Sequence, residues 1–215
     1  MAAGMGVLPG AYQRVEYLES TGTQYIDTGA PVSYGCVITI AFNTYKLNTS
    51  DNNIQYGWRY SGGYNGPSQL YLNANGDFGN KVVVIGVSAF GTGSNDWFSI
   101  DADNTVVLDS LFSTIQVNGQ DVTSGKYYNF DRGAAFDANG SSRYNPFLFA
   151  LNNIGTPSAF SKYTRIYKYT VEQNGKRVVN FIPCIRKSDS KPGMYDTVSK
   201  TFYTNAGTGE FVIPT

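Results

Sequence analysis

Hydrophobic and polar residues alternate along several short segments of the chain, a pattern typical of strands with one buried face. In residues 36–42 the alternation places Cys36, Ile38, Ile40 and Phe42 on one side and smaller or more polar residues on the other. This regularity predicts a strand that packs one face on a core.

Other runs predict further strands. Residues 81–87 are almost continuously apolar, which predicts a strand buried on both faces. In residues 163–171 the alternation predicts that Tyr167, Tyr169 and Val171 share a face. The remaining predicted strands are 105–108, 113–117, 147–151 and 177–185.

Turn signals separate these runs. Asn118-Gly119 and Asn174-Gly175 each lie between two strand-like segments and predict type I′ hairpins, whose central residues need positive φ. Asn75-Gly76 and Asn139-Gly140 predict other turns, and residues 91–95 an exposed loop. Since no stretch of ten residues carries a helical stripe, the pattern favours an all-β sandwich or barrel.

The length of 215 residues fits one domain, expected over residues 11–215. A small-residue arm, residues 1–10, precedes it. Its first eight residues lack the basic start and the apolar core of a secretory signal peptide. We expect the arm to dock on a neighbouring subunit, which implies a homo-oligomer.

Charge and composition exclude several classes of function. The chain has 16 basic and 16 acidic residues and no histidine. Without a basic stripe, nucleic-acid binding has no electrostatic support. No apolar run approaches the roughly 20 residues that cross a bilayer, so membrane insertion is not expected. The missing histidine removes the commonest zinc ligand and general base, and we expect no cofactor.

The two cysteines, Cys36 and Cys184, lie in separate strand-like runs and form no CxxC pair. Two buried free thiols are the favoured interpretation, because unpaired cysteine is among the most buried residue types. One disulfide between them is the alternative.

Segments near both ends of the chain resemble a known family. Residues 12–29, 181–189, 193–198 and 201–209 are similar to concanavalin A-like, laminin-G-like jelly rolls of phage structural proteins and gut bacterial surface proteins. The middle, roughly residues 45–144, carries no such similarity. The resemblance implies a two-sheet antiparallel jelly-roll sandwich with neighbouring terminal strands. It also implies carbohydrate binding or adhesion at a virion surface or outside the cell.

Catalysis is not expected. Glycan-hydrolysing relatives of this fold need two carboxylates roughly 5 to 9 Å apart. The pattern Glu-x-Asp-x-x-Glu is absent, and Asp101 and Asp103 are typical of a turn. Glu16 and Glu19 have odd spacing and would face opposite ways on a strand. A calcium site formed by Asp96, Asp101 and Asp103 is an alternative to ordinary solvated turn residues.

A sugar-binding site needs an exposed aromatic platform beside polar groups. Residues 55–65 are the first candidate, because Tyr56, Trp58 and Tyr60 share a face of an extended segment and Tyr64-Asn65 follows in a loop. Further candidates are Asp96-Trp97 and residues 127–132. Each aromatic also has the alternative of core packing, and a tyrosine-rich surface also suits protein contacts.

The sequence therefore predicts a non-catalytic virion module, in a decoration, fibre or tail, that adheres to host-surface glycans. One alternative is a purely structural virion subunit that contacts other virion proteins. The other is a carbohydrate-binding module on a bacterial cell surface.

Overall fold

The computed structural model describes residues 6–33, 35–46, 53–59, 68–72, 82–85, 88–91, 98–109, 114–122, 126–129 and 137–214. All regular secondary structure in these ranges is β-strand, and none of it is helical. The strands are β1 (Tyr12–Arg14), β2 (Leu18–Thr21), β3 (Ile26–Asp27), β4 (Cys36–Thr44), β5 (Asn53–Arg59), β6 (Ser68–Leu72), β7 (Val82–Ile85), β8 (Ser88–Gly91), β9 (Asp103–Asp109), β10 (Thr114–Val117), β11 (Gln120–Asp121), β12 (Lys126–Asn129), β13 (Phe147–Leu148), β14 (Leu151–Asn153), β15 (Thr156–Ser158), β16 (Lys162–Gln173), β17 (Lys176–Arg186), β18 (Lys191–Asp196) and β19 (Thr201–Thr204).

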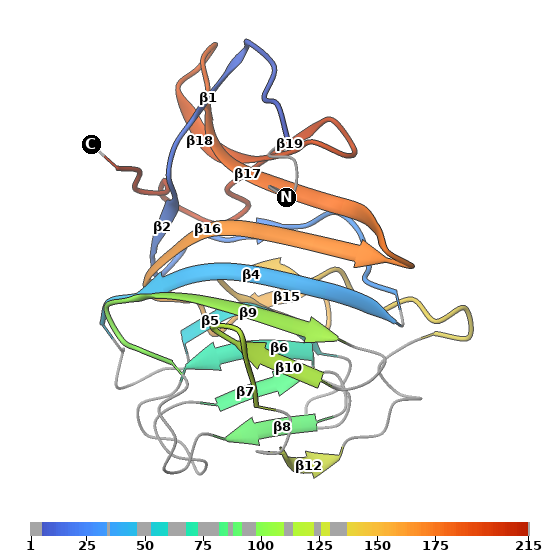
Figure 1. Ribbon diagram of the computed structural model, residues 1–215. Helices are drawn as coiled ribbons and strands as arrows, with labels where there is room; N and C mark the ends of the chain where they lie inside the picture. Colours follow the sequence, from blue (N-terminus) through green and yellow to red (C-terminus); the bar gives the residue numbers. More distant parts are fainter. Residues whose placement is uncertain are drawn as a thin grey trace.

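The strands form two sheets that pack as a sandwich, as predicted. Sheet A has the order β11-β10-β9-β4-β16-β17-β18-β19, with β1 beside β17 and β2 beside β16. Sheet B has the order β12-β8-β7-β6-β5-β13-β3, with β14 beside β5 and β15 beside β14. Strand pairs are antiparallel except β14 with β5. This architecture is consistent with a jelly roll, and Figure 1 shows β6, β7, β8 and β12 of sheet B below the upper strands of sheet A.

The core lies between the sheets and follows the alternation of β4. Cys36, Ile38, Ile40 and Phe42 are at most 1% exposed, while the residues between them are half-buried. The predicted face of this strand is therefore confirmed. Its packing excludes water from apolar surface, which is the main favourable contribution to folding.

The prediction that Tyr167, Tyr169 and Val171 share a face is wrong for Tyr167, as strand β16 shows. Tyr169 and Val171 face the core, but Tyr167 is half-buried on the other side of the sheet. The pairing of β16 with β4 shifts register between Ile166 and Lys168. A bulge inserts one residue and reverses the alternation, so Tyr167 leaves the face of its neighbours.

Residues 82–85 of the predicted strand 81–87 form β7, which pairs with β8 in an antiparallel hairpin, with Ile85 opposite Ser88. Residues 81, 86 and 87 lie outside the described residues, so burial of this run on both faces stays a prediction. The run 147–151 is split into β13 and β14, because Phe149 takes a φ of 66° that no strand accommodates. At residues 147–151 an apolar sequence thus continues through a change of chain direction, because β13 is antiparallel to β5 and β14 is parallel to it.

The two Asn-Gly hairpins are confirmed. Asn118 and Gly119 have φ values of 53° and 80°, and Asn174 and Gly175 have 51° and 71°. Positive φ at both central residues is what a type I′ turn requires. Residues 138–140 also form a turn, with the Asp137 carboxylate accepting the Asn139 and Ser141 amides.

The two ends of the chain are neighbours, as predicted. β1 pairs with β17, and Glu19 exchanges two backbone hydrogen bonds with Val212, at 2.8 and 3.0 Å. Near the C-terminal end, residues 193–196 belong to β18, which forms a hairpin with β19. The β1–β17 and Glu19–Val212 pairings hold segments from both ends of the chain on sheet A.

The described part of the N-terminal arm packs on its own chain. Arg14 donates to the Gly6 carbonyl at 3.2 Å, and the Lys187 ammonium donates to the Gly10 carbonyl at 2.8 Å. Residues 1–5 lie outside the described residues, so docking of the arm on a neighbouring subunit stays a prediction.

Both cysteines are buried free thiols, which confirms the favoured interpretation. Burial raises the pKa of the Cys184 thiol to about 12. This thiol therefore stays protonated and unreactive at neutral pH.

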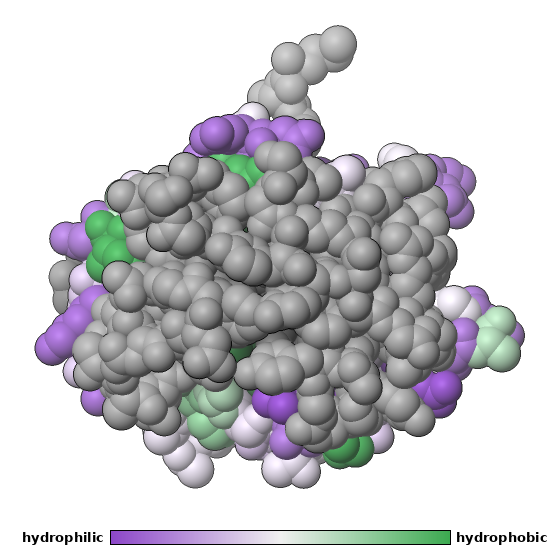
Figure 2. Space-filling model, turned by 90° about the horizontal axis from the view of Figure 1, so that it is seen from below, coloured by the Kyte–Doolittle hydropathy of each residue, from purple (hydrophilic) through white to green (hydrophobic). Residues whose placement is uncertain are grey.

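Seen from below, the described residues on the molecular surface are mostly hydrophilic, with separate hydrophobic side chains among them (Figure 2). Within the same described residues, no helix is long and apolar enough to span a bilayer.

Candidate functional site

The structure places two residues of the first predicted platform in the core. Tyr56 and Trp58 share a face of β5, as expected, but both side chains are 0% exposed. β5 is flanked by β6 on one side and by β13 and β14 on the other, and this face is turned toward sheet A. The Tyr56 ring lies 5.9 Å from the Tyr169 ring of sheet A. Neither residue is therefore available to a ligand at the surface.

The other predicted ligand residues lie outside the described residues. They are Tyr60, Tyr64, Asn65, Asp96 and Trp97. Of the third candidate, residues 127–129 belong to β12, and residues 130–132 are not described. These positions stay predictions.

Asp103 of β9 has partners within the protein. Asp103 accepts a hydrogen bond from the Asn43 amide at 3.2 Å and another from the Tyr167 hydroxyl. In the described part of the chain, no group of three or more Asp, Glu, Cys or His side chains lies together. Asp96 is outside that part, so the calcium alternative stays open.

A compact group of aromatic and charged side chains lies on the face of sheet A that is turned away from sheet B. We call it the tyrosine–arginine cluster; it consists of Tyr17, Glu19, Tyr45, Arg165 and Tyr167. The Arg165 guanidinium lies over two rings, 4.7 Å from the centroid of Tyr17 and 4.9 Å from that of Tyr45. Tyr17 and Tyr167 meet edge to face, with centroids 5.7 Å apart.

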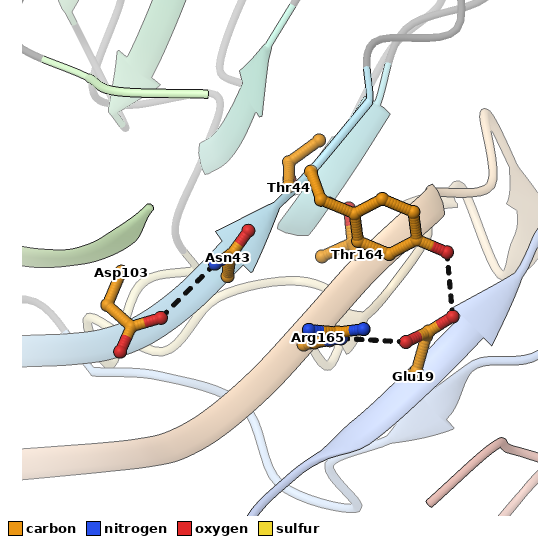
Figure 3. Close-up of polar contacts among 7 residues, drawn as sticks. Glu19, Asn43, Thr44, Asp103, Thr164 and Arg165 are labelled. Carbon is orange, nitrogen blue, oxygen red and sulfur yellow. Dashed lines mark hydrogen bonds and ion pairs between the residues drawn. The ribbon is translucent and has the colours of Figure 1, made fainter. Parts of the chain in front are cut away.

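Glu19 holds the cluster together. One carboxylate oxygen accepts the Arg165 Nε–H at 2.8 Å, and the other accepts the Tyr45 hydroxyl, also at 2.8 Å. Figure 3 shows Glu19 on β2 reaching Arg165 on β16, with the Asn43–Asp103 contact nearby. Charge-assisted hydrogen bonds of this kind fix side-chain orientation. The aromatic rings are thus held in place before any ligand arrives.

Two hydroxyls of this cluster, those of Tyr45 and Tyr167, have raised pKa values. Burial, followed by the hydrogen bond to Glu19, raises the pKa of Tyr45 to about 12. Burial and the hydrogen bond to Asp103 likewise raise the pKa of Tyr167 to about 12. At neutral pH both hydroxyls are therefore donors occupied by carboxylates.

We expect Glu19→Gln to lower the pKa of Tyr45 from about 12 toward its ordinary value of 10.0. The substitution removes the negative charge that opposes ionisation. The ζ-carbon NMR shift of ¹³C-labelled Tyr45, followed as the pH rises from about 9 to about 12, measures the change in this pKa. Because folding raises this pKa, the stabilisation is complete below pH 10 and is lost as the pH rises toward 12. Titration of Tyr45 near 10 in the unmodified protein would refute the assigned contact.

Beside the cluster, sheet A forks. One edge of β16 pairs with β2 over Lys162–Ile166 and with β17 from Tyr169 onward. The corresponding edge of β17 pairs with β16 up to Phe181 and with β1 from Cys184 onward. β16 and β17 therefore diverge, and β1 and β2 fill the opening, as the blue and orange strands of Figure 1 show.

A pocket of about 450 Å³ lies at this fork. Its apolar wall comes from Val15 of the β1–β2 connection and from residues 181–183 of β17. The Val15 amide donates to the Pro183 carbonyl at 3.1 Å, which ties the connection to β17. Tyr167 lines the pocket and also belongs to the tyrosine–arginine cluster, so the two features form one continuous surface. We call this cavity the fork pocket.

The charged wall of the fork pocket is mainly basic. Arg14, Lys168 and Arg177 line it together with a single acid, Glu16. Arg177 is also paired with Glu172 at 2.7 Å, outside the pocket lining. Glu16 and Glu19 both lie on the outer side of sheet A, contrary to the expected opposite faces, because β2 begins only at Leu18.

The sequence offered little signal for this site. The cluster joins residues in or directly next to β2, β4 and β16, and the fork depends on pairing between opposite ends of the chain. The bulge that turns Tyr167 outward has no distinctive sequence pattern. A comparison with protein-family models gave no match, and neither did comparisons with curated proteins and with solved structures.

Proposed function

We propose that this protein is a non-catalytic adhesion module that binds glycans through the outer face of sheet A. The observation that carries the proposal is the tyrosine–arginine cluster. It presents half-buried rings next to carboxylate, amide and guanidinium groups. Sugars offer apolar C–H faces and hydroxyls, which match aromatic rings and polar groups respectively. Rings already fixed by Arg165 and Glu19 lose little conformational entropy on binding.

We expect Tyr17→Ala and Tyr167→Ala each to weaken glycan binding by up to about tenfold, the effect of losing one aromatic stacking contact. A glycan array with fluorescently labelled protein measures the effect. Tyr144→Ala is the matched control, because Tyr144 is also half-buried but leads into β13 of sheet B.

Two results would count against the proposal. One is a wild-type protein that binds no glycan on the array. The other is binding that both outer-face substitutions leave unchanged.

We further propose that the module belongs to a virion, with a purely structural virion subunit as the alternative. The similarity of the two end segments to jelly rolls of phage structural proteins supports this location. Copurification of the chain with phage particles tests it. A chain found only in the bacterial cell wall fraction would instead favour a cell-surface module.

A further inference from the structure

We infer that the fork pocket binds the acidic residue of a glycan, a sugar that carries a carboxylate. This inference rests on the proposed glycan-binding function and names the class of sugar. Its basis is that the balance of charge in the pocket differs from that of the whole chain. The chain has equal numbers of basic and acidic residues, yet three basic residues and one acid line this pocket.

The three basic side chains line the same cavity, and Arg14 also donates to the Gly6 carbonyl at 3.2 Å. Lys168 is exposed at the bulge of β16, where the register shift directs it to the outer face. Arg177 enters from β17, and its pairing with Glu172 leaves only part of its guanidinium engaged. Arg14 enters from β1, across the fork. Even when Glu172 is counted, the basic residues around the pocket exceed the acids, three to two.

The rest of the pocket suits the body of a sugar. Val15, Ile182 and Pro183 offer an apolar wall on which the C–H face of a pyranose ring packs. Glu16 offers a carboxylate that accepts hydrogen bonds from sugar hydroxyls. The volume of about 450 Å³ is within the range of small-molecule sites and admits one monosaccharide with its linkage.

The neighbouring tyrosine–arginine cluster extends the site. Tyr167 lies at the boundary, so a sugar in the fork pocket would place the next residue of the chain against Tyr17 and Tyr167. The pocket thus contributes the preference for an acid, and the rings contribute contact with the remaining glycan.

The test titrates the full-length protein with D-glucuronate, with its neutral methyl ester and with acetate, followed by amide NMR shifts. We expect glucuronate to bind about tenfold tighter than the ester, because a charge-assisted hydrogen bond is lost in the ester. Lys168→Gln should remove most of that difference. Lys176→Gln is the matched control, since Lys176 is also exposed, at the start of the neighbouring strand β17, but lies outside the pocket lining.

Equal affinity for glucuronate and its ester would overturn the inference. It would also be overturned if the Lys168→Gln protein kept both its melting temperature and its preference for glucuronate over the ester. Acetate binding as tightly as glucuronate would overturn the assignment of a sugar. If glucuronate does not bind at all, the inference of an acidic sugar in the fork pocket is also overturned. The glycan array then separates the two claims: binding of neutral glycans keeps the proposed function, and binding of none removes both.

Discussion

Replacing Trp58 with alanine is expected to lower the free energy of unfolding by about 3–5 kcal/mol, the usual cost of removing a large buried aromatic side chain. Trp58 is 0% exposed in the central part of sheet B and belongs to the core that both sheets share. Its loss leaves a cavity that the flanking strands cannot close without breaking their pairing. Urea unfolding followed by circular dichroism measures the change.

Two comparisons make this result specific. Trp58→Phe should lose less stability, because it keeps an aromatic ring in the cavity. Tyr17→Ala removes a half-buried aromatic at the outer face and should also lose less. A Trp58→Ala protein with unchanged stability and reduced glycan binding would contradict the buried position of Trp58. That result would instead support the exposed platform predicted at residues 55–65.

Replacing Asp196 with alanine is expected to cost about 2–4 kcal/mol, because hydrogen bonds to a buried charged group are lost and their donors stay behind. The side chain is 2% exposed and accepts three backbone amides, those of Asn180 at 2.9 Å, Val198 at 3.0 Å and Ser199 at 3.1 Å. These bonds join β17 to the turn between β18 and β19. Thermal and urea unfolding measure the loss.

Asp189→Ala is the matched control for Asp196. Asp189 forms an ion pair with Arg186 at 2.6 Å on the open surface, where solvent screens the attraction. Its removal should change stability much less than removal of Asp196. Equal effects of the two substitutions would contradict the role assigned to the buried carboxylate.

Local sequence patterns predicted much of the fold. The alternation of Cys36, Ile38, Ile40 and Phe42 predicted the inner face of β4, because every second side chain of a regular strand points to the same face of the sheet. The Asn-Gly pairs predicted hairpins, because these residues tolerate positive φ. Both signals are contained in a few consecutive residues.

The site could not be predicted in the same way. Which face of an aromatic strand is buried depends on its neighbours, so Tyr56 and Trp58 suited an exposed platform as well as a core. The outward turn of Tyr167 depends on a bulge against β4. The fork pocket depends on Val15 meeting Pro183, a contact between distant parts of the chain that alternation does not encode.

The central claim, that glycans bind to the outer face of sheet A, is tested most directly by tyrosine NMR. Protein labelled with ζ-¹³C-tyrosine, with signals assigned by single Tyr→Phe substitutions, is titrated with the glycan that binds best on the array. We predict that the signals of Tyr17 and Tyr167 shift and that those of the buried Tyr56 and Tyr169 do not. Shifts confined to Tyr60 and Tyr64, with Tyr17 and Tyr167 unchanged, would contradict the claim.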